Sequence, residues 1–135
     1  MSFEIPERGY LLDTHIALWA IGRPNALSAR ALKVVLTGPN FLSVISYWEV
    51  MVKCMKGSLV LGDPRAWWTE ALEKLVAIPI ALQAEHIPAL ASLPPIHKDP
   101  FDRMLIAQAS VEGLTLVSMN ADIAKYASKS MRVIG

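Results

Sequence analysis

The sequence lacks the features of secreted and membrane-spanning proteins. It has a single cysteine, Cys54, which excludes an internal disulfide framework and a zinc site built from clustered cysteines. The first ten residues contain no apolar core of a secretory signal. Apolar runs end well before the roughly 18 residues that a membrane span requires. We therefore expect a cytoplasmic protein that is not associated with a membrane.

The sequence also lacks a charge excess of either sign. Thirteen Lys and Arg residues face twelve Asp and Glu residues, so the net charge is +1. Bulk attraction to nucleic acid is therefore not expected, and any such binding must come from a local basic patch. Glycine-rich phosphate loops and a His-Glu-x-x-His zinc motif are also missing from the sequence. Hydrophobic residues make up 53% of the chain, which favours a well-buried core and leaves apolar residues for an interface.

Short apolar strands alternate with helical segments along a chain that we interpret as one domain, residues 1–135. Strands are expected at 10–12, 41–45, 77–81, 114–117 and 132–134, and helices at 14–21, 28–37, 46–56, from 63 onward, and at 84–93, 99–112 and 121–126. This alternation predicts a three-layer α/β/α sandwich around a mainly parallel sheet.

Acidic and amide side chains follow the predicted strands. In parallel sheets, ligands bind at the carboxyl ends of the strands. Asp13, Glu49, Asp102 and Asn120 all lie just after a strand or in the first turn of the next helix. Clustered carboxylates repel one another unless cations are present, and Mg²⁺ or Mn²⁺ suits such oxygen ligands. The pattern indicates a metal site able to activate water against a phosphodiester.

Purely structural interpretations of these residues stay open. Ser46 and Glu49 have the spacing of a capping box, in which the glutamate binds back to the Ser46 N–H. Asp99 before Pro100 has the pattern of an N-cap, which leaves Asp102 in a position that favours the helix dipole. Asp13 is the hardest to explain by structure alone, because it follows a buried strand directly.

Four short motifs in order resemble the PIN-domain ribonucleases of VapBC toxin–antitoxin modules, the VapC-type toxins. They are L-L-D-T-H at 11–15, S-x-W-E-V at 46–50, D-P-F-D-R-M-L-I-A-Q-A at 99–109 and G-L-T-L-V-S at 113–118. The resemblance implies a PIN-like fold and a Mg²⁺- or Mn²⁺-dependent endoribonuclease, a hydrolase that cuts transfer or ribosomal RNA. It also implies a homodimer and a cognate VapB-type antitoxin.

The resemblance assigns roles residue by residue. Asp13, Glu49 and Asp102 would be the catalytic, metal-binding acids, and Thr14 and Ser118 would orient carboxylates or metal-bound water. The fourth acid of the family is replaced by Asn120, whose amide oxygen can still bind a metal or its water. Asp99 is a further candidate ligand, and Asp122 could replace the fourth acid.

The replacement at Asn120 also motivates an alternative: a degenerate PIN module that binds RNA or a protein partner without catalysis. A phosphohydrolase with Asp13 as nucleophile is a weaker alternative, because Thr14 and His15 stand where a second acid is usual. A local basic patch for RNA is expected from residues spread over two segments. They are Lys53, Lys56, Lys98 and Arg103, and a solvated helix face is the competing interpretation.

Overall fold

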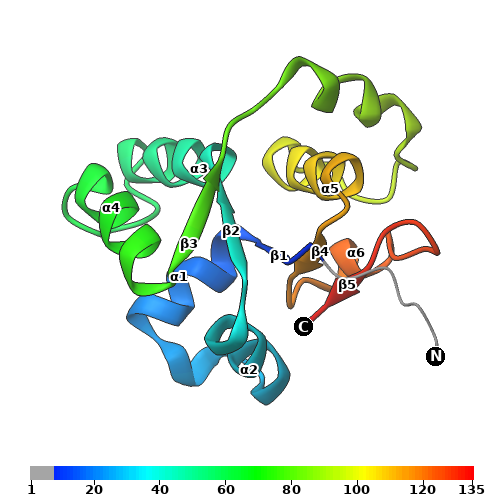
Figure 1. Cartoon of the computed structure of the whole chain (residues 1–135). Helices are drawn as coiled ribbons and strands as arrows, with labels where there is room; N and C mark the ends of the chain where they lie inside the picture. Colours follow the sequence, from blue (N-terminus) through cyan, green and yellow to red (C-terminus); the bar gives the residue numbers. More distant parts are fainter. Residues whose placement is uncertain (1–7) are drawn as a thin grey trace.

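A computed structural model describes residues 8–135, and residues 1–7, on which most of the expectation about a secretory signal falls, lie outside the described residues. The strands form one sheet in the order β3-β2-β1-β4-β5, and each neighbouring pair is parallel (Figure 1). They are β1 Tyr10–Leu12, β2 Asn40–Ser43, β3 Ala77–Ile80, β4 Thr115–Val117 and β5 Val133–Ile134. The predicted parallel sheet is confirmed. Strand β3 contains Pro79 and lies at the edge of the sheet, where the missing N–H of proline does not interrupt a pair of strands.

Helices follow the strands in the predicted alternation. They are α1 Thr14–Gly22, α2 Ala29–Thr37, α3 Val44–Met55, α4 Pro64–Lys74, α5 Pro100–Glu112 and α6 Ala121–Ala124, with short 3₁₀ helices η1 Pro24–Ala26, η2 Ala84–His86 and η3 Pro88–Ser92. Each α-helix begins at a polar residue whose side chain accepts a backbone N–H of the first turn. These caps are Asp13, Ser28, Ser43, Asp63, Asp99 and Asn120.

The sheet is covered on both faces, which gives the three layers. Leu12 of β1 packs with α1, α2 and α4 on one face, whereas its neighbour Leu11 packs with α5 on the other. This division follows from the alternation of side chains along a strand. Helix α3 contributes to both clusters, through Val50 and Ile45. Each fully buried leucine of this core stabilises the fold by about 1.5–3 kcal/mol.

The strand order reverses its winding direction at the centre of the sheet. From β1 the chain moves outward to β2 and β3, and then returns to add β4 and β5 on the other side of β1. The carboxyl ends of β1 and β4 therefore lie side by side where the winding direction reverses. In open α/β sheets this reversal is where ligands bind.

Two local expectations are corrected. Helix α3 begins after Ser43, whose hydroxyl accepts the Ile45 N–H at 3.0 Å, so Ser46 lies inside the helix and the capping box with Glu49 does not form. The segment 84–93 is not one helix, because Pro88 has no N–H and its ring blocks the preceding turn. The chain forms η2 before this proline and η3 from it onward.

In the part of the chain that the structure describes, none of the helices combines the length and apolar character needed to cross a membrane.

Candidate metal centre

Asp13 is buried at the carboxyl end of β1, the central strand. Its Oδ1 accepts the Ile16 N–H at 2.8 Å and thereby caps α1. The Ser118 hydroxyl, just after β4, also forms a hydrogen bond with this carboxylate. Burial raises the pKa of Asp13 to about 6, although both hydrogen bonds act to lower it. A carboxylate in such a dry position is stabilised by a proton or by a cation.

Glu49 lies on α3 and is also buried. Its Oε2 forms an ion pair of 2.7 Å with the ammonium of Lys53, one helical turn later. Its Oε1 is buried and has no hydrogen-bond partner. An ionised carboxylate oxygen without a partner is costly in a protein interior. This atom therefore indicates that the site is built to receive a further positive group.

Asp102 lies in the first turn of α5. The cap residue Asp99 accepts the Asp102 N–H through its Oδ1 at 2.9 Å, which fixes the first turn of the helix. His97 Nε2 lies 2.7 Å from Asp102 Oδ2. Burial raises the pKa of Asp102, the hydrogen bond to His97 opposes this, and the negative charges of Asp99 and Glu49 raise the pKa further.

The three acids come from three different elements and affect one another electrostatically. The charge of Asp102 raises the pKa of Asp13, and the charge of Glu49 raises that of Asp102. In the described residues their oxygens do not all approach within 4.8 Å of one another. The fold thus brings Asp13, Glu49 and Asp102 to one end of the sheet as neighbours, without closing them into a tight cage.

The expected helper residues occupy the same region. The Thr14 hydroxyl donates to Ser46 Oγ at 2.9 Å, and the Ser118 hydroxyl forms a hydrogen bond with the Asp13 carboxylate. Asn120 uses its amide oxygen to accept the Asp122 N–H at 2.8 Å and so caps α6. That oxygen is already engaged, which weakens the case for Asn120 as a metal ligand.

His97 has contacts that its position in the loop before α5 does not predict. Its side chain is only 17% exposed, and its Nδ1 lies 3.8 Å from Asp122 Oδ2. His97 thus stands between Asp102 and Asp122, the proposed replacement for the fourth acid. The nearby Asp99-Pro100 cap predicts where α5 begins, but no local pattern predicts that a residue before the cap folds back onto Asp102.

The loop that carries His97 is held by Tyr126 from the far end of the chain. The Tyr126 hydroxyl accepts the N–H groups of Ile96 and His97 at 3.2 and 2.9 Å, and donates to the Pro94 carbonyl at 2.8 Å. The guanidinium of Arg103 donates to the same hydroxyl at 3.1 Å. The position of His97 therefore depends on a side chain about 30 residues away.

The four residues expected to form a basic patch have different surroundings. Arg103 is half-buried and also donates to the carbonyls of Leu90, Pro94 and His97, so it holds the loop in place. Lys53 is paired with Glu49 inside the acidic site. Lys56 and Lys98 are exposed. The expected patch is thus reduced to these two lysines at the surface.

A second group of possible metal ligands lies away from these acids and consists of Glu85, His86 and Glu112. His86 is fully buried, and its Nδ1 accepts the Gln83 N–H at 2.9 Å. Its ring proton must therefore sit on Nε2, which lies 2.9 Å from Glu112 Oε2. Both ring nitrogens are thus used in hydrogen bonds, and these contacts give the pair a structural role that needs no metal.

A groove of about 550 Å³ runs beside the acidic site. It is lined by apolar residues of α1 and of the segment after α3, and by four polar or basic side chains: His15, Arg23, Lys53 and Ser58. The His15 ring lies 5.7 Å from that of Trp19.

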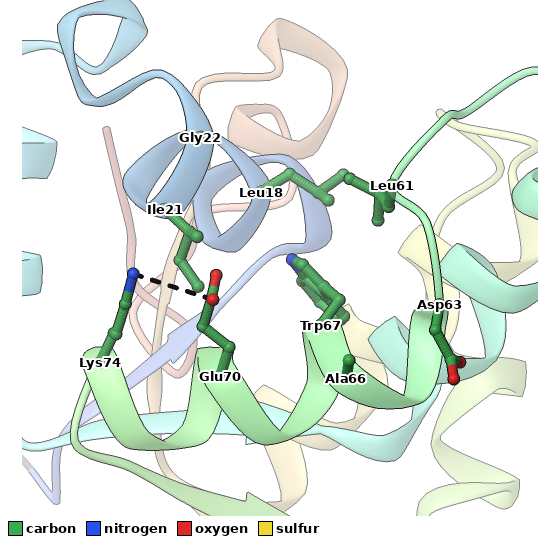
Figure 2. A pocket seen from close by; sticks show the side chains of 9 residues that line it. All are labelled: Leu18, Ile21, Gly22, Leu61, Asp63, Ala66, Trp67, Glu70 and Lys74. Carbon is green, nitrogen blue, oxygen red and sulfur yellow. Dashed lines mark ion pairs between the residues drawn. The ribbon is translucent and has the colours of Figure 1, made fainter.

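A smaller cavity of about 360 Å³ lies between α1 and α4 (Figure 2). None of the candidate acids lines either of these two cavities, and Trp67 Nε1, which belongs to the second, has no hydrogen-bond partner.

The residues present fit a divalent cation with oxygen ligands. The donor set consists of carboxylates, which suit Mg²⁺ or Mn²⁺ better than softer metals. The unpartnered Oε1 of Glu49 is the observation in this structure that supports the fit. Asp13 and Asp102 provide two further carboxylates at the same end of the sheet.

The fold resembles those of proteins solved as toxin–antitoxin complexes. A chain of the VapBC2 complex of Rickettsia felis, bound to a promoter DNA fragment, matches with a TM-score of 0.65 and 16% identity, over 92% of this chain and 96% of the other. A chain of FitAcB from Neisseria gonorrhoeae matches with a TM-score of 0.61 and 18% identity, over 93% and 96%. A chain of VapBC-5 from Mycobacterium tuberculosis matches with a TM-score of 0.57 and 18% identity, over 92% of this chain and 95% of the other.

Among curated protein sequences, none is significantly similar to this chain. The sequence profile of the PIN domain, in contrast, matches residues 10–129. This segment contains strands β1 to β4 and the three candidate acids. PIN domains are generally nucleases. The chain belongs to the PIN domain family.

Proposed function

We propose that the protein is a metal-dependent endoribonuclease of the VapC type, the toxin of a toxin–antitoxin pair. The observation that carries the proposal is the convergence of Asp13, Glu49 and Asp102, with a buried Glu49 oxygen that lacks a partner. A bound Mg²⁺ or Mn²⁺ would activate water and neutralise charge on the RNA phosphodiester. Catalysis would therefore not require a protein group as general base.

The residues of the chain have distinct tasks in this proposal. Asp13, Glu49 and Asp102 hold the ion, and Ser118 orients Asp13 through its hydroxyl. Thr14 lies beside them, bound to Ser46. RNA, or the tail of a VapB-type antitoxin, would lie in the groove that His15 and Lys53 line, and Lys53 links this groove to Glu49. Transfer or ribosomal RNA is the expected substrate, and the expected location is the cytoplasm.

Replacing Asp13 by Asn tests the proposal. Asparagine has almost the same shape and can still accept the Ile16 N–H, so the helix cap is retained. We expect D13N to lower Mn²⁺-dependent cleavage of RNA by at least about 100-fold, because a metal ligand loses its charge. Expression of the wild-type chain should arrest bacterial growth, and expression of D13N should not.

The matched control is D63N, which makes the same chemical change at the exposed cap of α4. D63N should cleave RNA as the wild type does. Circular dichroism and thermal unfolding of both variants establish that they are folded. Cleavage by folded D13N at the wild-type rate would overturn the proposal.

A second candidate function is a PIN module that binds a partner without catalysis. It is favoured by one observation: the amide oxygen of Asn120, at the position of the usual fourth acid, is used to cap α6. Calorimetric titration with Mn²⁺ distinguishes the two functions. Absence of Mn²⁺ binding, with and without RNA, would favour the module.

A further inference from the structure

Lys53 brings a positive charge into the acidic site from the same helix that carries Glu49. Its Nζ lies 2.7 Å from Glu49 Oε2, and its side chain is 34% exposed. The charges of Asp99 and Asp102 also act on this ammonium. Lys53 therefore faces the carboxylates of the site, whereas most lysines extend into water.

The two oxygens of Glu49 have unequal surroundings. Oε2 is neutralised by Lys53, and Oε1 is buried without a partner. A metal that binds Oε1 does not need to displace the ammonium from Oε2. The geometry thus allows a divalent ion and the Lys53 ammonium to share one carboxylate.

The balance of charge limits how many such ions the site can hold. Asp13, Glu49 and Asp102 contribute three negative charges, and Lys53 cancels one of them. Asn120 adds no charge. The remaining charge of about −2 is matched by one divalent ion, and a second ion close by would face the ammonium as well as the first ion.

The other charged groups around the site have partners of their own. Asp99 is engaged with the N-terminus of α5, where its charge is stabilised by the helix dipole. Asp122 pairs with Lys125 at 3.2 Å. His97 contacts Asp102 and adds a positive charge only when it is protonated. The charge balance therefore rests on Lys53 and the three acids Asp13, Glu49 and Asp102, while Asp99 and Asp122 act on the site from its edge.

We propose that the Lys53 ammonium takes the place of a second metal ion, so that the site binds a single divalent cation. This inference rests on the proposed function, because it concerns the same acidic site. In this arrangement Lys53 is a positioning residue that acts through Glu49. It gives a role to the lysine that lies one helical turn after Glu49 and whose ammonium reaches Glu49 Oε2.

Counting bound Mn²⁺ tests the proposal without any measurement of activity. The full chain, freed of metal with EDTA and without RNA, is titrated with Mn²⁺, and free Mn²⁺ is followed by electron paramagnetic resonance. We expect one bound ion in the wild type and two in K53Q. K53R retains the positive charge and should bind one ion. K56Q is the matched control, since Lys56 is exposed at the end of the same helix, and it should also bind one.

Each other outcome has a definite meaning. Two ions in the wild type, or one ion or none in K53Q, would overturn the role of Lys53 and leave the proposed nuclease standing. No bound Mn²⁺ in the wild type would overturn the proposed metal site and this inference together. If K53Q does not fold, as judged by circular dichroism, K53M keeps the aliphatic stem of lysine and gives the same test.

Discussion

Asp13 combines a structural and a chemical task in one side chain. It caps α1 through Oδ1, and its burial raises its pKa from 3.8 to about 6. Because the folded state then binds its proton more tightly than the unfolded state does, Asp13 stabilises the metal-free protein most fully at low pH. That contribution is lost as the pH rises through about 6, and it amounts to at most about 3 kcal/mol.

The metal-free protein should therefore have a lower free energy of unfolding at pH 7 than at pH 5. Urea denaturation in the presence of EDTA across this range measures the effect. In D13N the decline should be smaller, and the part that remains would report Asp102, whose pKa is also raised. An equal decline in D13N and the wild type would contradict the assignment to Asp13.

The role of Asp99 as the cap of α5 could be predicted from the sequence. The Asp-Pro pair indicated the cap, and the observed bond from the Asp102 N–H to Asp99 Oδ1 confirms it. The ion pair of Lys53 with Glu49 could not be predicted, because an i, i+4 pair fits a solvated helix face equally well. Only the burial of Glu49, which tertiary packing determines, separates the two cases.

At the scale of elements, local sequence patterns predicted the segment between β3 and α5 least well, because the helix expected at 84–93 is replaced by two short 3₁₀ helices. Residues 94–99 have no regular structure and are held by the hydroxyl of Tyr126 and the guanidinium of Arg103. The sequence could not reveal this, because it depends on a contact with a distant helix end. Similarly, the β-branched pair Val44-Ile45 favoured a strand, whereas burial of Ile45 in the core favours the observed start of α3.

Replacing Tyr126 by Phe tests whether this loop supports the site. The change leaves the ring in the core but removes the acceptor of the Ile96 and His97 N–H groups. We expect a loss of about 1–3 kcal/mol in the free energy of unfolding, since partly buried donors lose their partner. RNA cleavage should fall by more than the loss of folded protein, because His97 no longer holds Asp102.

The control for this prediction is Y47F, on α3, where the ring is stacked on Trp68 with centroids 4.9 Å apart. Urea denaturation and a cleavage assay on the folded fraction of both variants give the comparison. Equal effects of Y126F and Y47F on cleavage would indicate that the loop does not position the site.

At the scale of the whole molecule, the aromatic residues divide between the core and the surface. Trp67 is buried, and Trp19 and Trp68 pack against the core. Trp48 is 57% exposed and meets Phe101 edge to face, with ring centroids 5.0 Å apart. These two rings neighbour Glu49 and Asp102 in the sequence, so an interface here would adjoin the site.

We expect the protein to be a homodimer that uses this aromatic pair. Sedimentation equilibrium should give twice the chain mass of 14.8 kDa, and W48D should shift the mass toward that of one chain, because a charge would be buried in the contact. The control is L36D, at a more exposed apolar position, on α2. A monomeric wild type, or a dimer unaffected by W48D, would contradict the expectation.

The central place of β1 in the sheet determines when, during synthesis, the acidic set becomes complete. Strands β1, β2 and β3 can pair once the first 80 residues have emerged from the ribosome, and they bring Asp13 and Glu49 with them. Asp102 arrives on α5, and β4 then takes its place on the other side of β1 and supplies Ser118. A partly synthesised chain therefore carries two of the three carboxylates. In the proposed toxin, this order would delay activity until most of the chain has left the ribosome that made it.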